Sequence, residues 1–167
     1  MRPEFAQLFP NDVALIKAYA QSAVHVRQMA VGLVDDVIKA RPIPGKWSSQ
    51  EVFIHIADAD AAFTHRLKRI LAEDRPTYNK WNEDDFVANL FYHEQSAMDA
   101  VTLIEINHRQ LSKIIAAKGL SCLDRKGVHS QAGEQSAREV LMYATWHIGH
   151  HLNFVKEKLA AYNAASS

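Results

Sequence analysis

The chain has 167 residues, of which 48% are hydrophobic and 23% are charged, a composition typical of a globular protein with a buried core. Basic and acidic side chains number 19 each, so no excess positive charge favours binding to nucleic acid or to an anionic membrane. No apolar stretch approaches the roughly 20 residues that a transmembrane helix requires, and we expect one domain over residues 1–167 that does not associate with membranes.

Four long helical segments are predicted in chain order, and each is bounded by residues that start or stop helices. The second and fourth begin with capping boxes, in which a serine is followed three residues later by glutamate. These are Ser48 with Glu51, and Ser136 with Glu139. Gly119 is placed to end the third helix. The predicted helices cover about 11–40, 48–73, 84–118 and 136–162.

Residues 120–135 separate the third and fourth helices and are expected to form a polar loop, since the sequence shows no strand pattern. Four long helices with short connections predict an all-α fold, an up-and-down antiparallel four-helix bundle. In such a bundle the second and fourth helices run parallel to each other. Sites in bundles are built from side chains on facing helices, so the positions of the 9 histidines decide where chemistry is expected.

The fourth helix carries an inward pair of histidines. At 100° per residue its apolar side chains form one narrow stripe, with His151 beside the stripe and His147 on the same flank. His150 points away. Two histidines four positions apart lie one above the other and can bind one ion together. The stripe consists of Leu141, Ile148, Leu152, Val155 and Leu159.

The second helix presents a third histidine in the same way. His55 lies on the flank of the apolar stripe, with Asp58 one turn away on the same side, and His65 falls on the far side. If the two helices start at similar heights, His55, His147 and His151 lie at comparable levels. We therefore expect a three-histidine divalent-metal site between helices two and four, with a coordination position left open. The stripe of this helix consists of Val52, Ile56, Ala59, Phe63 and Ile70.

Several other side chains leave alternatives open. Asp58 either orients His55 or a bound water, which would give it a catalytic role, or is a solvated helix residue. His93 and His108 fall on the apolar stripe of the third helix, and a buried, hydrogen-bonded histidine is preferred over an approach to the metal site. Met142 and Trp146 lie away from the core stripe of the fourth helix, which is compatible with a dimer interface.

The single cysteine, Cys122, excludes an internal disulfide and fits a reducing compartment. The N-terminal sequence lacks the basic and apolar regions of a signal peptide. We therefore expect a cytoplasmic protein.

Two segments resemble the motifs of the DinB superfamily. The first runs from Pro44-Gly45-Lys46-Trp47-Ser48 into His55-Ile56-Ala57-Asp58, and is similar to the family's Gly-x-Trp-Ser turn followed by a helix start and a histidine. The second, Trp146-His147-Ile148-Gly149-His150-His151-Leu152, is similar to the His-x-x-x-His motif on the family's last helix. The motifs fall in the expected order, so the resemblance covers essentially the whole chain.

The resemblance implies a four-helix bundle with one divalent ion, nickel or zinc, held by His55, His147 and His151. It also implies a homodimer, since several members of the family form one. Characterised members include transferases and isomerases that depend on low-molecular-weight thiols, which implies a small thiol as a reaction partner.

Three neutral imidazoles leave the double charge of a divalent ion uncompensated. Such an ion lowers the pKa of bound water to about 7 or deprotonates a coordinating thiol. The preferred function is therefore a metal-dependent thiol S-transferase that activates the thiol for attack on a small-molecule electrophile. The alternatives are a metal-dependent hydrolase and a non-catalytic metal-binding protein of the stress response.

Overall fold

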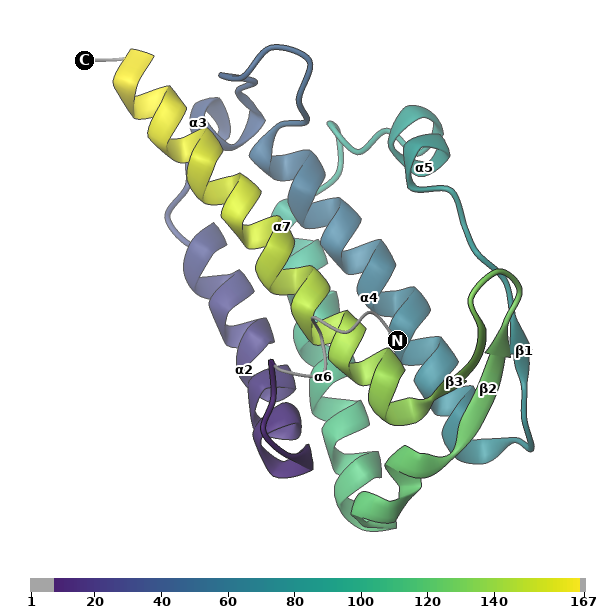
Figure 1. The fold of residues 1–167 in the computed structure, drawn as a ribbon. Coiled ribbons are helices and arrows are strands. Elements are labelled where there is room, and N and C mark those ends of the chain that lie inside the picture. The colour runs from purple at the N-terminus through teal and green to yellow at the C-terminus, as the bar shows by residue number, and fades with distance from the viewer. Residues whose placement is uncertain (1–7, 166–167) are drawn as a thin grey trace.

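Four long helices pack side by side in the computed structural model, which describes residues 8–165 (Figure 1). They are α2 (Asp12–Ala30), α4 (Ser49–Ala72), α6 (Ala97–Lys118) and α7 (Ala137–Ala165). Shorter elements connect them: α3 (Asp35–Lys39), β1 (Thr77–Tyr78), α5 (Glu83–Asn89), the 3₁₀ helix η1 (Leu120–Asp124), β2 (Lys126–His129) and β3 (Gly133–Ser136). The predicted all-α four-helix bundle is confirmed.

Both predicted capping boxes are present. Ser48 Oγ accepts from the backbone N–H of Glu51 at 3.1 Å, and Glu51 Oε2 accepts from the backbone N–H of Ser48 at 2.6 Å. Ser136 and Glu139 repeat this exchange at 3.2 and 2.7 Å. Each box satisfies backbone donors that a helix start otherwise leaves unpaired. The start of α4, six positions before His55, is thereby fixed.

The chain path through the bundle differs from the predicted one. Helix α4 packs against α6 and α7, and α2 packs against the same two helices, so α2 and α4 lie diagonally across the bundle. Helices α4 and α6 run in one direction, whereas α2 and α7 run in the other (Figure 1). The second and fourth long helices are therefore antiparallel, where we expected them to be parallel. The reason is the long connection 73–96, which returns the chain to the opposite end of the bundle before α6 begins.

Two predicted helices are also interrupted. The first ends at Ala30, before Gly32 at φ +84° in the left-handed region, and the chain resumes as α3. The third is broken over residues 90–96, where Phe91 adopts φ +54°. Ser96 then caps a new helix, because its Oγ accepts from the backbone N–H of Asp99 at 3.1 Å. Hydrophobic periodicity alone does not detect such breaks.

A small sheet replaces much of the polar loop expected at 120–135. Strand β1 pairs in parallel with β2, and β2 pairs antiparallel with β3. The sheet packs against the end of α4 at Gly127, where a Cβ would lie 2.9 Å from both Ile70 Cγ1 and Tyr78 Cε1. Such a separation is too short for carbon atoms, so only glycine fits between α4 and β1.

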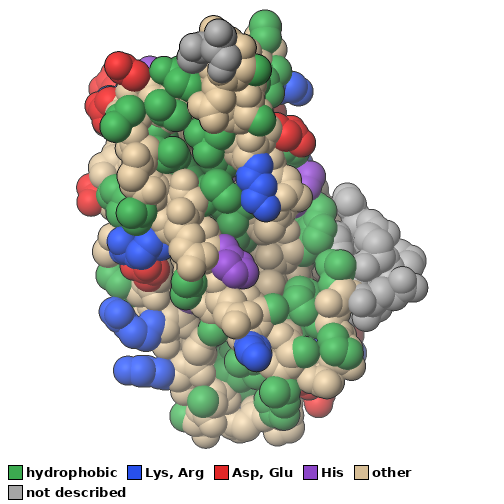
Figure 2. All heavy atoms as spheres, turned by 90° about the vertical axis from the view of Figure 1, so that its left-hand side faces the viewer, with side chains coloured by type: hydrophobic (Ala, Val, Ile, Leu, Met, Phe, Trp, Pro, Cys, Tyr) green, Lys and Arg blue, Asp and Glu red, His purple; other side chains and the backbone are tan. Residues whose placement is uncertain are grey.

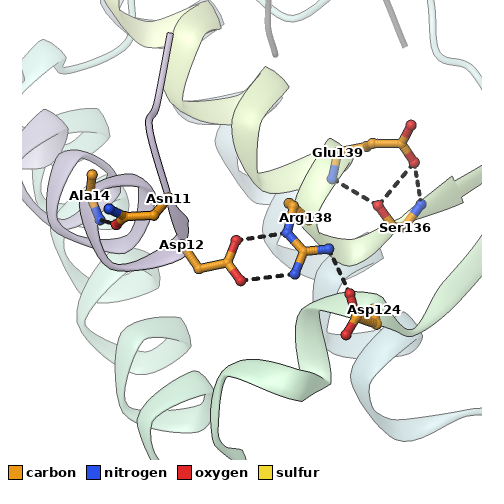
Figure 3. A network of polar contacts seen from close by, with 7 residues as sticks. All are labelled: Asn11, Asp12, Ala14, Asp124, Ser136, Arg138 and Glu139. Carbon is orange, nitrogen blue, oxygen red and sulfur yellow. Dashed lines mark hydrogen bonds and ion pairs between the residues drawn. The ribbon is translucent and has the colours of Figure 1, made fainter. Parts of the chain in front are cut away.

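The start of α7 is tied to two other elements by Arg138 (Figure 3). Its guanidinium donates to both carboxylate oxygens of Asp12, at 2.7 and 2.8 Å, and to Asp124 Oδ1 at 2.6 Å. Because Asp12 is the first residue of α2, this two-pronged ion pair holds the first turns of α2 and α7 together. Asp124 adds the end of η1 to the same cluster.

A hydrogen-bonded polar cluster around His108 and Asp60 lies among the apolar side chains of the bundle core. His108 Nε2 lies 2.8 Å from Asp60 Oδ1, and His108 Nδ1 lies 2.8 Å from the carbonyl oxygen of Tyr19. Both side chains are buried, and Asn107 donates to Asp60 Oδ2 at 2.9 Å. The preferred interpretation of His108 as a hydrogen-bonded core histidine is confirmed. His93 is instead exposed in the turn before α6.

The surface mixes side chains of all kinds. Figure 2 shows the side of the molecule on which α2 lies, where acidic, basic and hydrophobic side chains are interspersed. Among residues 8–165, no helix combines the length and the hydrophobicity needed to cross a bilayer.

Replacement of Asp60 by alanine should lower the free energy of unfolding by about 3–5 kcal/mol, because it leaves His108 buried without its partner. Urea denaturation followed by circular dichroism measures this change. The matched control is Asp35→Ala, which removes the exposed ion pair with Lys39 and should cost less than about 1 kcal/mol. Equal effects of the two substitutions would contradict a structural role for the buried pair.

Candidate metal centre

Helices α4 and α7 bring together the three histidines singled out in the sequence. His55 Nε2 lies 3.3 Å from His147 Nε2 and 3.2 Å from His151 Nε2. One nitrogen from each ring lies within 4.8 Å of the others. His55 and His147 are buried, and His151 is half-buried. The three rings therefore present their nitrogens to one common point between the two helices.

Helical geometry explains why these three meet and the others do not. His147 and His151 are one turn apart on α7, and their ring centroids are 4.3 Å apart. His150 turns outward and stacks on Trp146, with 4.7 Å between the ring centroids. His65 is exposed on α4. The structure thus separates inward and outward histidines as the helical wheels predicted.

The surroundings keep the three imidazoles neutral. Burial lowers the pKa of His55 to about 4, despite the opposing effect of Asp84. Burial and the neighbouring histidines lower the pKa of His147 to about 2 and that of His151 to about 3. Only a neutral imidazole has a lone pair available for a metal. At neutral pH the site is therefore in the state that a ligand set requires.

The nitrogen positions fit a bound ion better than a hydrogen-bonded cluster. A neutral imidazole carries one proton, so His55 Nε2 can donate to only one of the two nitrogens beside it. Two ligand nitrogens about 2.0–2.1 Å from a tetrahedral ion lie about 3.3 Å apart. The two measured separations, 3.3 and 3.2 Å, match that value. The three histidines form a group that could hold a divalent metal ion.

Aromatic side chains hold the His55 ring. Trp47 and Trp81 lie 5.2 and 5.9 Å from it, measured between ring centroids. Trp47 is half-buried against the core. Trp81 was not singled out in the sequence, because it lies in the connection before α5, where no periodicity points to a role.

Asp58 lies near the site but does not contact the histidines directly. Its Oδ2 accepts a hydrogen bond from the hydroxyl of Tyr92, which lies in the turn between α5 and α6. Within residues 8–165, Nδ1 of His55 and Nδ1 of His151 have no hydrogen-bond partner. Asp58 is therefore not hydrogen-bonded to His55, and its catalytic role stays a prediction.

A cavity of about 740 Å³ opens beside the histidines. His55 and His147 line it together with side chains of α4, the β2–β3 hairpin, the first turns of α7 and the segment 80–83. This volume lies within the range of pockets that bind small molecules. The cavity can therefore bring a small molecule next to His55 and His147.

Comparison with known proteins places this arrangement in a family. The family model of the DinB superfamily matches residues 18–155, which include all three histidines. The chain belongs to the DinB superfamily. The resemblance drawn from the two sequence motifs is thus confirmed, and the match extends from α2 to the last turns of α7.

Two relatives of this DinB protein carry informative names. One, from Oceanobacillus iheyensis, is named a putative metal-dependent hydrolase and is 25% identical over 108 residues, which cover 65% of this chain and 62% of that protein. The other is the solved structure of YfiT from Bacillus subtilis, described as a probable metal-dependent hydrolase with an unusual four-helix bundle topology. It matches with a TM-score of 0.80 at 16% identity, covers 91% of this chain and 89% of its own, and shares the fold.

The stability of the metal-free protein should fall as the pH drops below about 6.5. The unfolded chain then binds protons on His55, His147 and His151, whereas their lowered pKa values keep the folded chain from doing so. Urea denaturation in the presence of a chelator, from pH 7.5 to pH 5, measures this dependence. His147→Ala should make it shallower, and His65→Ala, at an exposed position, should leave it unchanged. The prediction would be wrong if the free energy of unfolding varied with pH in the same way in the unchanged protein and in both variants.

Proposed function

We propose that His55, His147 and His151 hold one divalent metal ion, zinc or nickel, and that the protein is a metal-dependent enzyme acting on a small molecule. The convergence of three imidazole nitrogens within 4.8 Å of one another, beside a cavity, carries this proposal, and the two separations from His55 Nε2 match tetrahedral spacing. Three protein ligands leave a coordination position free, as in catalytic rather than structural zinc sites. Nitrogen ligands accept several first-row ions, so the choice between zinc and nickel rests on the family resemblance.

The side chains around the site have separable roles. The imidazoles bind through Nε2, and burial between α4 and α7 keeps them unprotonated. Trp47 and Trp81 pack against the His55 ring and limit its movement. A divalent ion bound there would lower the pKa of a coordinated water or thiol, and so supply a nucleophile at neutral pH. The cavity wall would hold the molecule that is attacked.

Water is the first candidate nucleophile, which makes the protein a hydrolase. The names of the two relatives support this choice, since both refer to metal-dependent hydrolysis. A small thiol is the second candidate, which makes the protein an S-transferase. The family resemblance drawn from the sequence supports it, and the cavity of about 740 Å³ is of a size that binds small molecules. Both reactions use the same three histidines and differ in what occupies the open position.

Replacement of His147 or His151 by alanine should weaken binding of Zn²⁺ and Ni²⁺ by more than about 100-fold, because each substitution removes a direct ligand. Isothermal titration calorimetry of the metal-stripped protein measures the affinity. The matched control is His150→Ala, one residue from His151 but turned outward onto Trp146, which should change the affinity little. Loss of binding in His150→Ala with binding retained in His151→Ala would contradict the ligand assignment.

Turnover should require the metal, and its dependence on thiol decides between the two nucleophiles. The metal-loaded protein is incubated with panels of esters, amides and electrophiles, with and without cysteine or another small thiol. Product formed without thiol identifies a hydrolase, and product formed only with thiol identifies an S-transferase. The His147→Ala variant serves as the inactive control. Metal binding without turnover across both panels would leave the protein as a non-catalytic metal-binding protein and would contradict the proposed enzyme.

The homodimer and the cytoplasmic location stay predictions. Met142, one of the two side chains considered for a dimer interface, is buried in the core and cannot contribute. Trp146 is partly buried against the same core. The family resemblance is then the remaining support for a homodimer, and the buried thiol of Cys122 remains in keeping with a reducing compartment.

A further inference from the structure

Arg66 faces the cavity without a carboxylate partner. Its guanidinium lies over the rings of Phe63 and Tyr78, 5.6 and 5.4 Å from their centroids, and donates to the carbonyl oxygen of Asn79 at 2.7 Å. The side chain is half-buried, and burial lowers its pKa. In the part of the chain that the structure describes, no acidic side chain forms an ion pair with it. A desolvated guanidinium in a cavity wall is a binding group for an anion.

A second arginine on the same helix shows the contrast. Arg69, three positions later, also donates to a backbone carbonyl, that of Thr77, at 2.7 Å. It is nevertheless neutralised, because it forms an ion pair with Glu73 at 2.6 Å. Arg66 therefore differs from Arg69 in two respects: it has no carboxylate partner among the described residues, and it lies beside the cavity.

Two further donors line the cavity near Arg66. His129 Nδ1 accepts from the backbone N–H groups of Gln131 and Ala132, at 3.0 and 3.1 Å. The proton of the neutral ring therefore sits on Nε2, which makes that nitrogen a donor. Lys80 lines the same cavity, and together with burial, Arg66 and Lys80 lower the pKa of His129. Arg66, Lys80 and His129 therefore lie close enough to interact with one another in one region of the cavity wall.

Three acidic side chains also line the cavity, and among residues 8–165 none of them forms an ion pair with Arg66 or Lys80. Glu134 forms ion pairs with Arg75 and Lys126, at 2.8 and 2.6 Å. Glu139 is used in the capping box at the start of α7. Glu83 is exposed in the first turn of α5. Arg66 and Lys80 therefore bring two positive charges to the cavity wall, and the neutral His129 ring adds an N–H donor.

We propose that Arg66, Lys80 and His129 bind an anionic group of the substrate, a carboxylate or a phosphate, while its reactive part lies at the three histidines. This inference rests on the proposed function, because it makes the cavity a substrate site. Arginine offers two parallel N–H groups that match the two oxygens of either anion.

The spacing along α4 sets the shape of such a substrate. From position 55 to position 66 the helix rises about 16 Å, so His55 and Arg66 lie at different ends of the cavity. A ligand that reaches both is elongated, with its negative charge away from the bond that reacts. A compact anion would fill only the end at Arg66, which makes simple anions suitable probes of that end alone.

The test is a titration of the metal-free protein with inorganic phosphate and, separately, with succinate, followed by NMR of the His129 ring. Saturable shifts are expected with at least one of the two anions, and the tighter one identifies the anionic group. Arg66→Met should weaken this binding at least tenfold, and Arg66→Lys should weaken it less, because it keeps the charge. Arg69→Met is the matched control and should bind as the unchanged protein does.

Two outcomes would overturn the inference: no saturable shift with either anion, or equal affinities of Arg66→Met and Arg69→Met. Circular dichroism of each variant confirms that it is folded, and the Arg66→Lys protein provides a second comparison if Arg66→Met is not. Metal binding of the Arg66 variants, measured by calorimetry, should be unchanged. A protein that binds the anion but no metal would contradict the proposed function, whereas one that binds metal but no anion would contradict this inference alone.

Discussion

Three neutral imidazoles buried between two helices impose the main constraint on this structure. His55 Nε2 lies within hydrogen-bond distance of the Nε2 atoms of both other rings. A neutral imidazole carries a single proton, so this nitrogen cannot donate a hydrogen bond to both of them. The arrangement therefore has to be held by its surroundings. The capping box of Ser48 and Glu51 fixes where α4 begins, the aromatic rings of Trp47 and Trp81 fix His55, and the tie from Arg138 to Asp12 fixes the start of α7.

The parts of the site that follow helical periodicity were accessible from sequence. His147 and His151 share a face because they are four positions apart, and the capping boxes are local patterns that need no tertiary information. The relative direction of α4 and α7 was not accessible in this way. A helical wheel gives the face of a side chain but not the direction of its helix, so the same three histidines satisfy a parallel and an antiparallel arrangement.

The elements that escaped prediction are those set by tertiary contacts. Strands β2 and β3 have four residues each and no alternation of polar and apolar side chains, and Gly127 is explained only by the approach of Ile70 and Tyr78. His129 lies at the end of β2 and Trp81 in the connection between β1 and α5, so no pattern pointed to them. The histidine cluster thus comes from the regular helices, whereas much of the cavity wall comes from irregular segments.

The parallel course of α4 and α6 has an electrostatic consequence. Each helix carries a partial negative charge at its C-terminus, and two such ends lie at the same end of the bundle. Arg125, just after η1, donates from its guanidinium to the carbonyl oxygens of Ile70 and Glu73 at the end of α4. The acidic side chain of Asp12 lies in the first turn of α2, where the helix dipole carries a partial positive charge. Each long helix has one parallel and one antiparallel neighbour, so fixed side-chain charges add to the compensation of helix ends that lie beside a parallel helix.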